Sequence, residues 1–331
     1  MLLSKLQKNK RRKIASELKK AKELILRSKD IAIASHVNPD GDSIGSLLSL
    51  GIGLESIGKR VYMISSDGVP ERYKCLPGAA RIIRKIDKPV DLAIGVDCSS
   101  KEILGETYDS FRSARSILEI DHHDFRRPFG DIKLVDSKAA AVGELIYLLL
   151  EELSADITKD VAQNLMTSIV VETNSFRLPN VRPFTFEVCT KLINVGIDFY
   201  KLVDTIFWSK RKESAVLSGV CMARCKFIKN GRVAWSVIRK KDFDMVRGRD
   251  EDIDGVPDEM RSIQDVKIAL LFREKEKNTF RVSIRSKDKI NVASIAEKYG
   301  GGGHFDVAGC SIPNSEKALK EFLRLTASLL T

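Results

Sequence analysis

Short apolar segments alternate with helical patterns through the first half of the chain. Apolar runs of strand length occupy residues 31–35, 61–64, 92–96 and 116–120. Apolar positions recur at helical spacing in residues 43–57, 139–153 and 158–170. Strands that alternate with helices are typical of a parallel sheet with helices on its faces. We therefore predict an α/β fold, with a parallel-sheet first domain at residues 30–195.

The pattern changes after residue 195. Residues 196–225 contain two helical patterns around the exposed run Lys210-Arg211-Lys212, and we predict that they form a helical linker. Beyond the linker, strand patterns occupy residues 233–238, 266–272 and 279–285, and helical patterns occupy residues 291–299 and 315–329. This order predicts a second, smaller α+β domain at residues 226–331.

Composition narrows the class of protein. The 331 residues are 43% hydrophobic and 31% charged, which is enough apolar material for two folded domains. No run approaches the ~18 apolar residues of a membrane span, and the N-terminus lacks the apolar region of a secretion signal. The six cysteines show neither a disulfide framework nor zinc-site spacing. We expect a cytoplasmic protein with no membrane partner.

Positive charge is concentrated at the N-terminus. Residues 1–29 hold eight lysines, three arginines and two glutamates, so they carry most of the formal net charge of +11. Leu18, Ala21 and Ile25 recur at helical spacing among these lysines, which favours a solvated amphipathic helix. A sequence-independent contact with RNA is the alternative interpretation of this basic segment.

Carboxylates and imidazoles follow three of the predicted strands. The first strand leads into His36-Val-Asn-Pro-Asp40-Gly-Asp42, a later one into Asp97, and the next into Asp121-His122-His123. Because ligands bind at the carboxyl ends of parallel strands, we expect these side chains to meet at one edge of the sheet. The alternative for Asp40 and Asp42 is that they cap the helix that begins near Ser43.

Five of these residues have the chemistry of metal ligands. They are His36, Asp40, Asp42, Asp97 and His122. Imidazole combined with carboxylates suits Mn²⁺, Mg²⁺, Fe²⁺ or Zn²⁺, and neighbouring carboxylates repel unless a cation neutralises them. Five ligands are enough for two ions, which is a recurring arrangement for attack on phosphorus.

A second group of residues points to anion binding in the C-terminal domain. Gly300-Gly-Gly-Gly303 precedes His304, and a glycine run exposes backbone N–H groups to a ligand. Arg285-Ser286-Lys287 follows a predicted strand of the same domain and offers a partner for phosphate.

In this order, the motifs resemble the DHH family of phosphoesterases. The matching segments are His36 to Ser46, Gly95-Val-Asp97, Asp121-His122-His123, Glu172 to Asn180, Arg285-Ser286 and Gly301 to Gly309. The resemblance covers nearly the whole chain and is closest to the nanoRNase/pAp-phosphatase type. It implies a DHH catalytic lobe and a DHH-associated lobe with a cleft between them.

The resemblance also implies a role for each matched residue. One Mn²⁺ would be held by His36, Asp40 and Asp97, and a second by Asp42, Asp97 and His122. Mg²⁺ or another divalent metal is the alternative. His123 would lie beside the substrate phosphate, and Asp121 would orient a neighbouring imidazole. The terminal phosphate or nucleotide of the substrate would be bound by Arg285, Ser286, Gly302, Gly303 and His304.

Three positions depart from the family pattern. The fourth motif usually has a metal-binding Asp followed by Thr-Gly, where this chain has Glu172-Thr-Asn. Arg126 replaces the asparagine that usually follows DHH by three positions, and Val307-Ala-Gly replaces Ala-Ala-Gly. Glu172 keeps the carboxylate and adds one methylene group, so we include it among the candidate metal ligands.

The predicted function is hydrolysis of short oligonucleotides, linear dinucleotides such as pApA, and 3′-phosphoadenosine 5′-phosphate (pAp), through water activated by two metals. Because of the departures at Glu172 and Arg126, a weakly active nucleotide-binding or sensor protein is the main alternative. A pyrophosphatase or polyphosphatase is a further alternative, which the glycine-rich C-terminal motif argues against. The sequence is also compatible with a homodimer.

Overall fold

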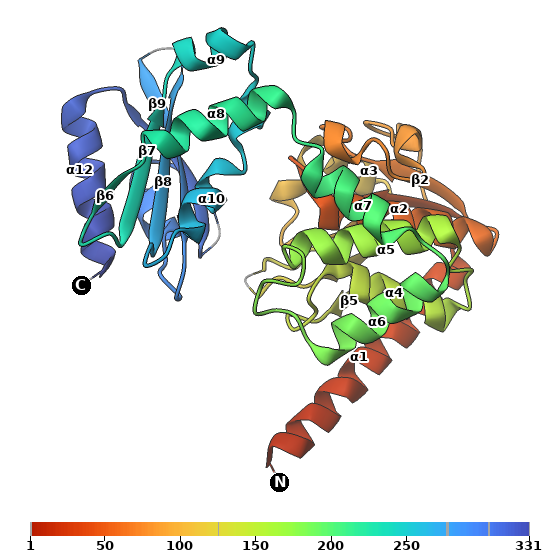
Figure 1. The fold of residues 1–331 in the computed structure, drawn as a ribbon. Coiled ribbons are helices and arrows are strands. Elements are labelled where there is room, and N and C mark those ends of the chain that lie inside the picture. The colour runs from red at the N-terminus through yellow and green to blue at the C-terminus, as the bar shows by residue number, and fades with distance from the viewer. Residues whose placement is uncertain (1, 125, 276–277, 304, 331) are drawn as a thin grey trace. The chain divides into compact units, whose positions relative to one another are not determined.

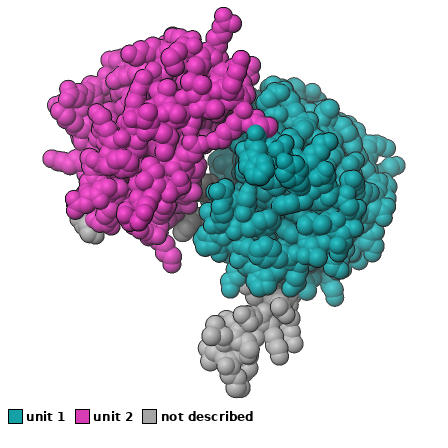
Figure 2. All heavy atoms as spheres, in the orientation of Figure 1, with its two compact units in different colours: residues 1–208 teal, residues 209–331 magenta. Residues whose placement is uncertain are grey.

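A computed structural model describes residues 2–124, 126–275, 278–303 and 305–330. The chain divides into two compact units, Met1–Trp208 and Ser209–Thr331, which Figure 2 shows in different colours. Each unit contains a sheet and an apolar core. The boundary between the units falls inside the segment predicted as a linker.

A five-stranded sheet, entirely parallel, forms the centre of the first unit, in the order β2-β1-β3-β4-β5 (Figure 1). The strands are β1 (Asp30–Ala34), β2 (Arg60–Ile64), β3 (Leu92–Val96), β4 (Ser116–Asp121) and β5 (Ile132–Val135). Ile31 and Ile33 enter a large core on one face, whereas Ala32 and Ala34 enter a smaller core on the other. Because both faces are buried, the strands read as continuous apolar runs in the sequence.

Helices cover the large core. They are α1 (Leu2–Arg27), α2 (Gly41–Ser56), α4 (Val142–Leu153), α5 (Lys159–Glu172) and α6 (Pro183–Asn194). The buried side chains of α1 include Leu18, Ala21 and Ile25, the residues that carry the predicted amphipathic pattern. On the other face, α3 (Tyr108–Arg112) contributes Phe111 to the smaller core. The short helix α7 (Phe199–Val203) and a π-helical turn at Asp204–Trp208 complete the unit.

Close packing of two helices brings their functional ends together. A Cβ atom on Gly45 of α2 would lie 2.5 Å from the carbonyl oxygen of Asn164 on α5. Only glycine allows this approach, so α2 and α5 cross nearly in backbone contact. Asp42 in the first turn of α2 and Glu172 in the last turn of α5 consequently belong to the same region of the unit.

The second unit contains a six-stranded sheet in the order β10-β11-β9-β8-β7-β6, antiparallel except for the β7–β8 pair. Its strands are β6 (Lys226–Ile228), β7 (Val233–Ile238), β8 (Ile268–Lys275), β9 (Thr279–Ser286), β10 (Gly302–Gly303) and β11 (Val307–Pro313). Phe272, Phe280 and Phe322 form the core beneath α11 (Ala293–Lys298) and α12 (Glu316–Ala327). On the opposite face, α8 (Lys212–Ala223) and α10 (Val256–Ser262) cover a second core, and α9 (Lys240–Val246) follows β7.

These observations confirm the predicted α/β class with its parallel first sheet. Most of the elements that the sequence pattern missed are short or strongly polar, namely α3, β5, β6, α9, α10 and β10. Two longer elements were also missed: α6, which starts with a proline, and β11, which begins shortly after the glycine segment. None of the helices among the described residues is long and apolar enough to cross a membrane.

Candidate active site

The loop after β1 carries the first two ligand-type residues. His36 lies just beyond the strand, and its Nδ1 contacts the carbonyl oxygen of Val37 at 2.7 Å. Because a carbonyl only accepts, Nδ1 holds the proton and Nε2 is the nitrogen directed at the site. Asp40 is the N-cap of α2, since its Oδ1 accepts from the backbone N–H groups of Asp42 and Ser43 at 2.9 and 3.0 Å. Asp40 therefore caps a helix and also faces the cluster described below.

Two further carboxylate residues of the site, Asp42 and Asp97, are buried. Asp42 is fully buried, and its oxygens accept from the hydroxyl groups of Ser46 and Ser168 and from the N–H of Val142. Asp97 directly follows β3 with a φ of 58°, a left-handed conformation that is costly for a side chain with a Cβ. Such strain persists where surrounding structure imposes it, and here it accompanies a carboxylate at the sheet edge.

Buried ion pairs hold the segment after β4 in place. Asp121 Oδ1 accepts from Nδ1 of His123 at 2.7 Å, which fixes this ring. The Arg126 guanidinium donates to both Asp121 and Glu119, two carboxylates of β4 that are fully buried. Glu119 also accepts from the backbone N–H groups of Phe129 and Gly130. Arg126 thus ties the loop after β4 to the strand that carries it.

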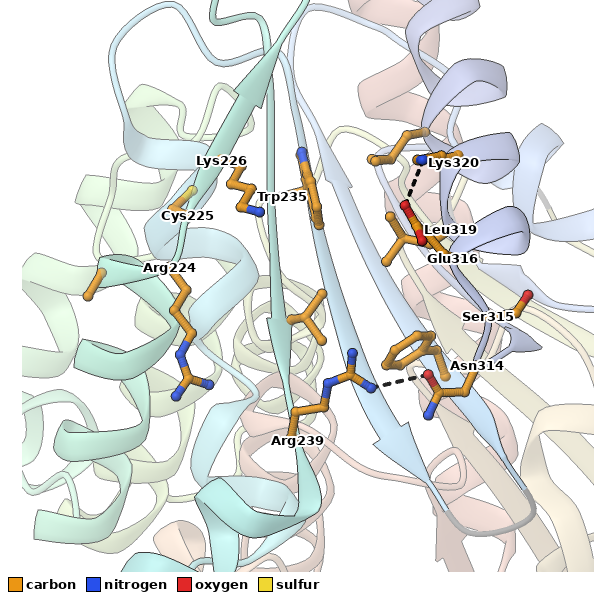
Figure 3. Close-up of a pocket in the computed structure, with 14 residues that line it drawn as sticks. Arg224, Cys225, Lys226, Trp235, Arg239, Asn314, Ser315, Glu316, Leu319 and Lys320 are labelled. Carbon is orange, nitrogen blue, oxygen red and sulfur yellow. Dashed lines mark hydrogen bonds and ion pairs between the residues drawn. The ribbon is translucent and has the colours of Figure 1, made fainter.

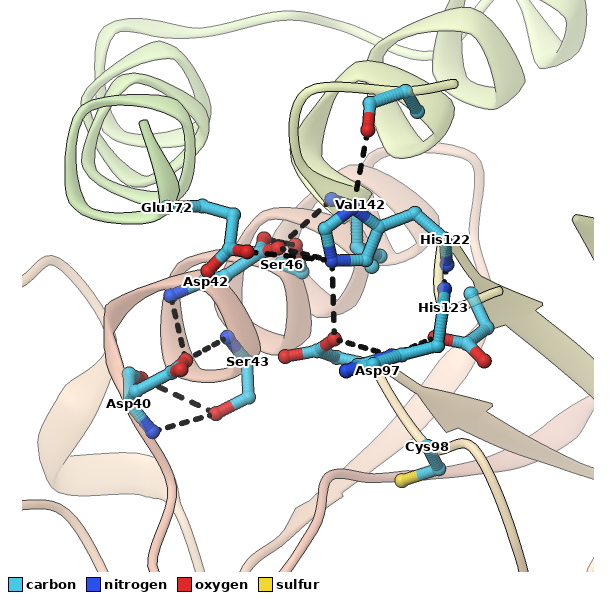
Figure 4. A network of polar contacts seen from close by, with 12 residues as sticks. Asp40, Asp42, Ser43, Ser46, Asp97, Cys98, His122, His123, Val142 and Glu172 are labelled. Atoms are coloured by element: carbon cyan, nitrogen blue, oxygen red, sulfur yellow. Dashed lines mark hydrogen bonds and ion pairs between the residues drawn. The ribbon is translucent and has the colours of Figure 1, made fainter. Parts of the chain in front are cut away.

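These elements bring six ligand-type side chains into one cluster, and Figure 4 labels all of them except His36. Nε2 of His36 lies 3.5 Å from Asp97 Oδ2. Nε2 of His122 lies 3.6 Å from Asp42 Oδ2, 3.8 Å from Asp97 Oδ1 and 3.7 Å from Glu172 Oε1. Asp40 joins His36 and Asp97 in a group whose ligand atoms lie within 4.8 Å of one another. The additional methylene group of Glu172 does not prevent its carboxylate from reaching the cluster.

Crowded negative charge governs the pKa values. Burial and the charge of Asp97 raise the pKa of Asp42 to about 7, and burial together with Asp42 raises the pKa of Glu172 well above its usual range. Burial opposes protonation of the imidazoles, but Asp97 raises the pKa of His36 to about 9. In the same way, Asp42, Asp97 and Glu172 raise the pKa of His122 to about 9. The site therefore retains protons until another positive charge replaces them.

The donor set fits divalent metal ions. Asp97 Oδ1 is buried and has no hydrogen-bond partner among the described residues. In two further groups of three the ligand atoms also lie within 4.8 Å of one another, namely Asp42, His122 and Glu172, and Asp97, His122 and His123. The Nδ1 atom of His122 contacts the carbonyl oxygen of Ala139 at 3.1 Å, which directs Nε2 to the cluster. Carboxylate oxygens and neutral imidazole nitrogens of this kind suit Mn²⁺, Mg²⁺ and related ions.

A cationic group in the second unit lies between β9 and α10. Arg285 Nε donates to Asp258 Oδ2 at 3.2 Å, and Arg261 pairs with the other oxygen of Asp258 at 3.0 Å. Arg261 also donates to the carbonyl oxygen of Ser286 at 3.2 Å and lies 3.9 Å from Asp306. Two guanidinium groups are thereby gathered at the end of β9.

Gly302 and Gly303 form β10, are exposed, and pair with β11. A Cβ atom on Gly303, whose φ is 148°, would lie 2.3 Å from the carbonyl oxygen of Val307. The close approach of the Val307 backbone therefore requires glycine at this position. Ser286 is buried and donates its hydroxyl to the carbonyl oxygen of Ile290, so this side chain stabilises the turn instead of facing solvent. His304 lies outside the described residues.

Comparison with known proteins gives the family. The DHH family N-terminal domain matches residues 30–169, and the DHHA1 domain matches residues 244–331. The chain belongs to the DHH family. The bifunctional oligoribonuclease and PAP phosphatase NrnA of Thermus thermophilus is 27% identical over 85% of this chain and 84% of its own length.

Two solved structures share the fold of this chain. An exopolyphosphatase-related protein from Bacteroides fragilis superposes with a TM-score of 0.89 at 23% identity, over 96% of this chain and 98% of its own. The exonuclease RecJ bound to manganese superposes with a TM-score of 0.59 at 14% identity, covering 95% of this chain and 94% of its own. At these identities the likeness shows the fold alone.

Several DHH-site residues were missed by sequence reasoning. Glu119 lies inside an apolar strand pattern, and Ser168 is one hydroxyl within a helix. Arg126 was noted only as a departure from the family pattern, and its ion pairs with Glu119 and Asp121 were missed. Asp258 and Arg261 belong to the missed helix α10. A charged residue inside a buried strand, such as Glu119, was the one available signal, because a buried carboxylate requires a partner.

Proposed function

We propose that this DHH protein hydrolyses short oligonucleotides or linear dinucleotides such as pApA to mononucleotides, and that it releases phosphate from pAp. The observation that carries the proposal is the convergence of six side chains on one edge of the first sheet, namely His36, Asp40, Asp42, Asp97, His122 and Glu172. The name of the Thermus relative joins oligoribonuclease to PAP phosphatase activity, which supports this substrate class.

Two Mn²⁺ ions are the proposed cofactors. His36, Asp40 and Asp97 would hold one ion, and Asp42, Asp97 and His122 the other, with Glu172 beside the second. Manganese in the RecJ structure supports this choice of metal. Bound metal supplies Lewis acidity and lowers the pKa of water toward neutrality, which provides a nucleophile without a covalent intermediate.

The protein side chains position the substrate. Burial opposes protonation of His123, but the hydrogen bond to Asp121 and the charge of Asp97 raise its pKa. A protonated imidazole fixed by Asp121 donates to a phosphate oxygen and stabilises the charge that develops there. Arg285 and the backbone N–H groups of Gly302 and Gly303 are proposed to bind the terminal phosphate of the substrate, which favours short substrates.

The test is to incubate the metal-loaded protein with pApA, pAp and pyrophosphate in parallel. We expect mononucleotide from pApA, phosphate from pAp and no turnover of pyrophosphate. Rapid hydrolysis of pyrophosphate alone would replace the proposal with a pyrophosphatase.

The same preparation is analysed for metal content. Absence of turnover on all three compounds, with two metal equivalents bound, would identify a nucleotide-binding protein and contradict the hydrolase. In that case Glu172→Asp is the next variant, because it restores the shorter carboxylate of the family pattern.

A further inference from the structure

A groove of about 920 Å³ opens on the α12 face of the second sheet (Figure 3). Trp235 and Val237 line it from β7, Leu319 and Leu323 from α12, and Phe280 from β9. The volume lies within the range of small-molecule sites, and the lining is mainly apolar, as in such sites. Figure 3 shows the Trp235 ring standing across the groove from Leu319.

The groove is separate from the cationic group at the end of β9. Strand order places β6 and β7 at one edge of the sheet and β10, with its glycines, at the other. The two sites also use opposite faces, because Arg285 pairs with Asp258 on α10, whereas the groove lies beside α12. A ligand in the groove would therefore not occupy the substrate-binding residues of this unit.

Positive charge surrounds the apolar lining. The charged lining residues are Arg224, Lys226, Arg239, Lys320 and Glu316. Three of the four cations have a carboxylate partner: Arg224 pairs with Asp242, Arg239 with Glu274, and Lys320 with Glu316. Lys226 makes no ion pair with any carboxylate that the structure describes, and its ammonium lies 5.3 Å from the centre of the Trp235 ring. It is the cation with the most capacity for a ligand anion.

Aromatic surface combined with cations selects a particular ligand chemistry. A nucleobase stacks on an indole ring, and ammonium or guanidinium groups bind the attached phosphate. Trp235 Nε1 is also buried without an acceptor among the described residues, so the indole offers an unused hydrogen-bond donor. An uncharged apolar ligand would leave Lys226 without a counter-charge.

We propose that this groove binds a nucleoside monophosphate, with its base against Trp235 and its phosphate near Lys226. The choice of a mononucleotide rests on the proposed function, of which it is the product. Binding requires neither turnover nor metal, so this proposal and the proposed function succeed or fail separately. The assignment places a product-binding site in the DHHA1 unit, away from Arg285.

Fluorescence of Trp235 tests the proposal in the full chain. Trp208 is the other tryptophan, so Trp208→Phe leaves Trp235 as the single reporter. The variant is titrated with AMP in the presence of a chelator, with adenosine and ribose 5-phosphate as partial ligands. We expect saturable quenching by AMP and weaker binding of either part alone.

A matched pair of charge reversals identifies the site. Lys226→Glu, in the same background, should weaken AMP binding about tenfold, because a charge-assisted contact is lost. Lys241→Glu makes the same change at an exposed position that does not line the groove, and it should leave binding unchanged. Both variants should hydrolyse pApA like the parent.

Four outcomes would overturn the proposal. They are absence of a saturable signal, an equal effect of the two charge reversals, binding of long RNA without binding of AMP, and a signal that depends on protein concentration alone. The last would indicate that a second copy of the chain covers the groove.

Discussion

The cluster of metal-ligand-type residues around Asp97 and the cationic group around Arg285 differ in how their charges are balanced. Around Asp97, carboxylates are crowded and buried, and among the described residues only histidines pair with them, so the cluster retains protons. Around Arg285, the guanidinium groups already have partners, since Asp258 and Asp306 lie within the same unit. Under the proposed function, the first site would require a cation before it accepts an anionic substrate. An anion at the second site would have to compete with the internal carboxylates.

Removal of the shared carboxylate should have the largest effect. Asp97→Asn keeps the size of the side chain but removes the charge that faces His36, His122 and His123. We expect kcat/KM for pApA to fall at least about 10³-fold, because metal contributes several kcal/mol to such reactions. Turnover and bound manganese are measured on the same sample.

Asp87→Asn is the matched control, because Asp87 is highly exposed and lies outside the cluster. It should retain full turnover and metal. Retained turnover in Asp97→Asn, with metal tightly bound, would contradict the bridging role of Asp97 and weaken the contrast between the two sites.

Arg126→Gln should mainly affect stability. The substitution leaves Glu119 and Asp121 buried without their cation, and breaking a buried pair costs roughly 3–5 kcal/mol. We expect this decrease in the free energy of unfolding, measured with urea, together with a lower kcat because Asp121 no longer fixes His123. The double variant Glu119→Gln/Arg126→Gln should recover part of the stability, and recovery of none would show that the pair does not act as a unit.

Sequence reasoning reached the ligand-type residues of the site but not the groups that hold them. The apolar runs predicted the parallel sheet, and the strand ends predicted which carboxylates and imidazoles would meet, because strand direction alone brings them to one edge. The partners of those residues come from positions distant in sequence, such as Ser168 with Asp42. No local pattern encodes such pairs. Likewise, the helix that carries Arg261 is too short and polar to produce a clear periodicity.

Manganese affinity should increase with pH. In the metal-free protein the pKa values of His36 and His122 are raised to about 9, so both rings are protonated at pH 7. Protonation of these rings stabilises the metal-free fold fully below pH 6.5, and this stabilisation is lost as the pH rises through about 9. Metal must displace the protons, so affinity should rise up to about tenfold per pH unit for each proton displaced, and level off above pH 9.

Titration with Mn²⁺ in a weakly buffered solution tests this sign directly, because proton release accompanies binding. Affinity that stays flat from pH 7 to 9, without proton release, would mean that the imidazoles are neutral before metal binds. The cluster around Asp97 would then hold no imidazole protons for the metal to displace, and this difference from the group around Arg285 would be lost.

Arg285→Ala should have the smallest effect and should act on KM. The guanidinium is proposed to bind the terminal phosphate, which does not react, so its loss weakens substrate and transition state alike. We expect KM for pApA to rise about tenfold with kcat nearly unchanged. Arg281→Ala is the matched control, because Arg281 lies on the same strand four residues earlier and is exposed. Equal effects of the two variants would show that the second unit attracts substrate by net charge, and a fall in kcat alone would place Arg285 with the reacting phosphate. A selective rise in KM would instead separate the two sites by role: the cluster around Asp97 performs the chemistry, and the DHHA1 unit holds the end of the substrate.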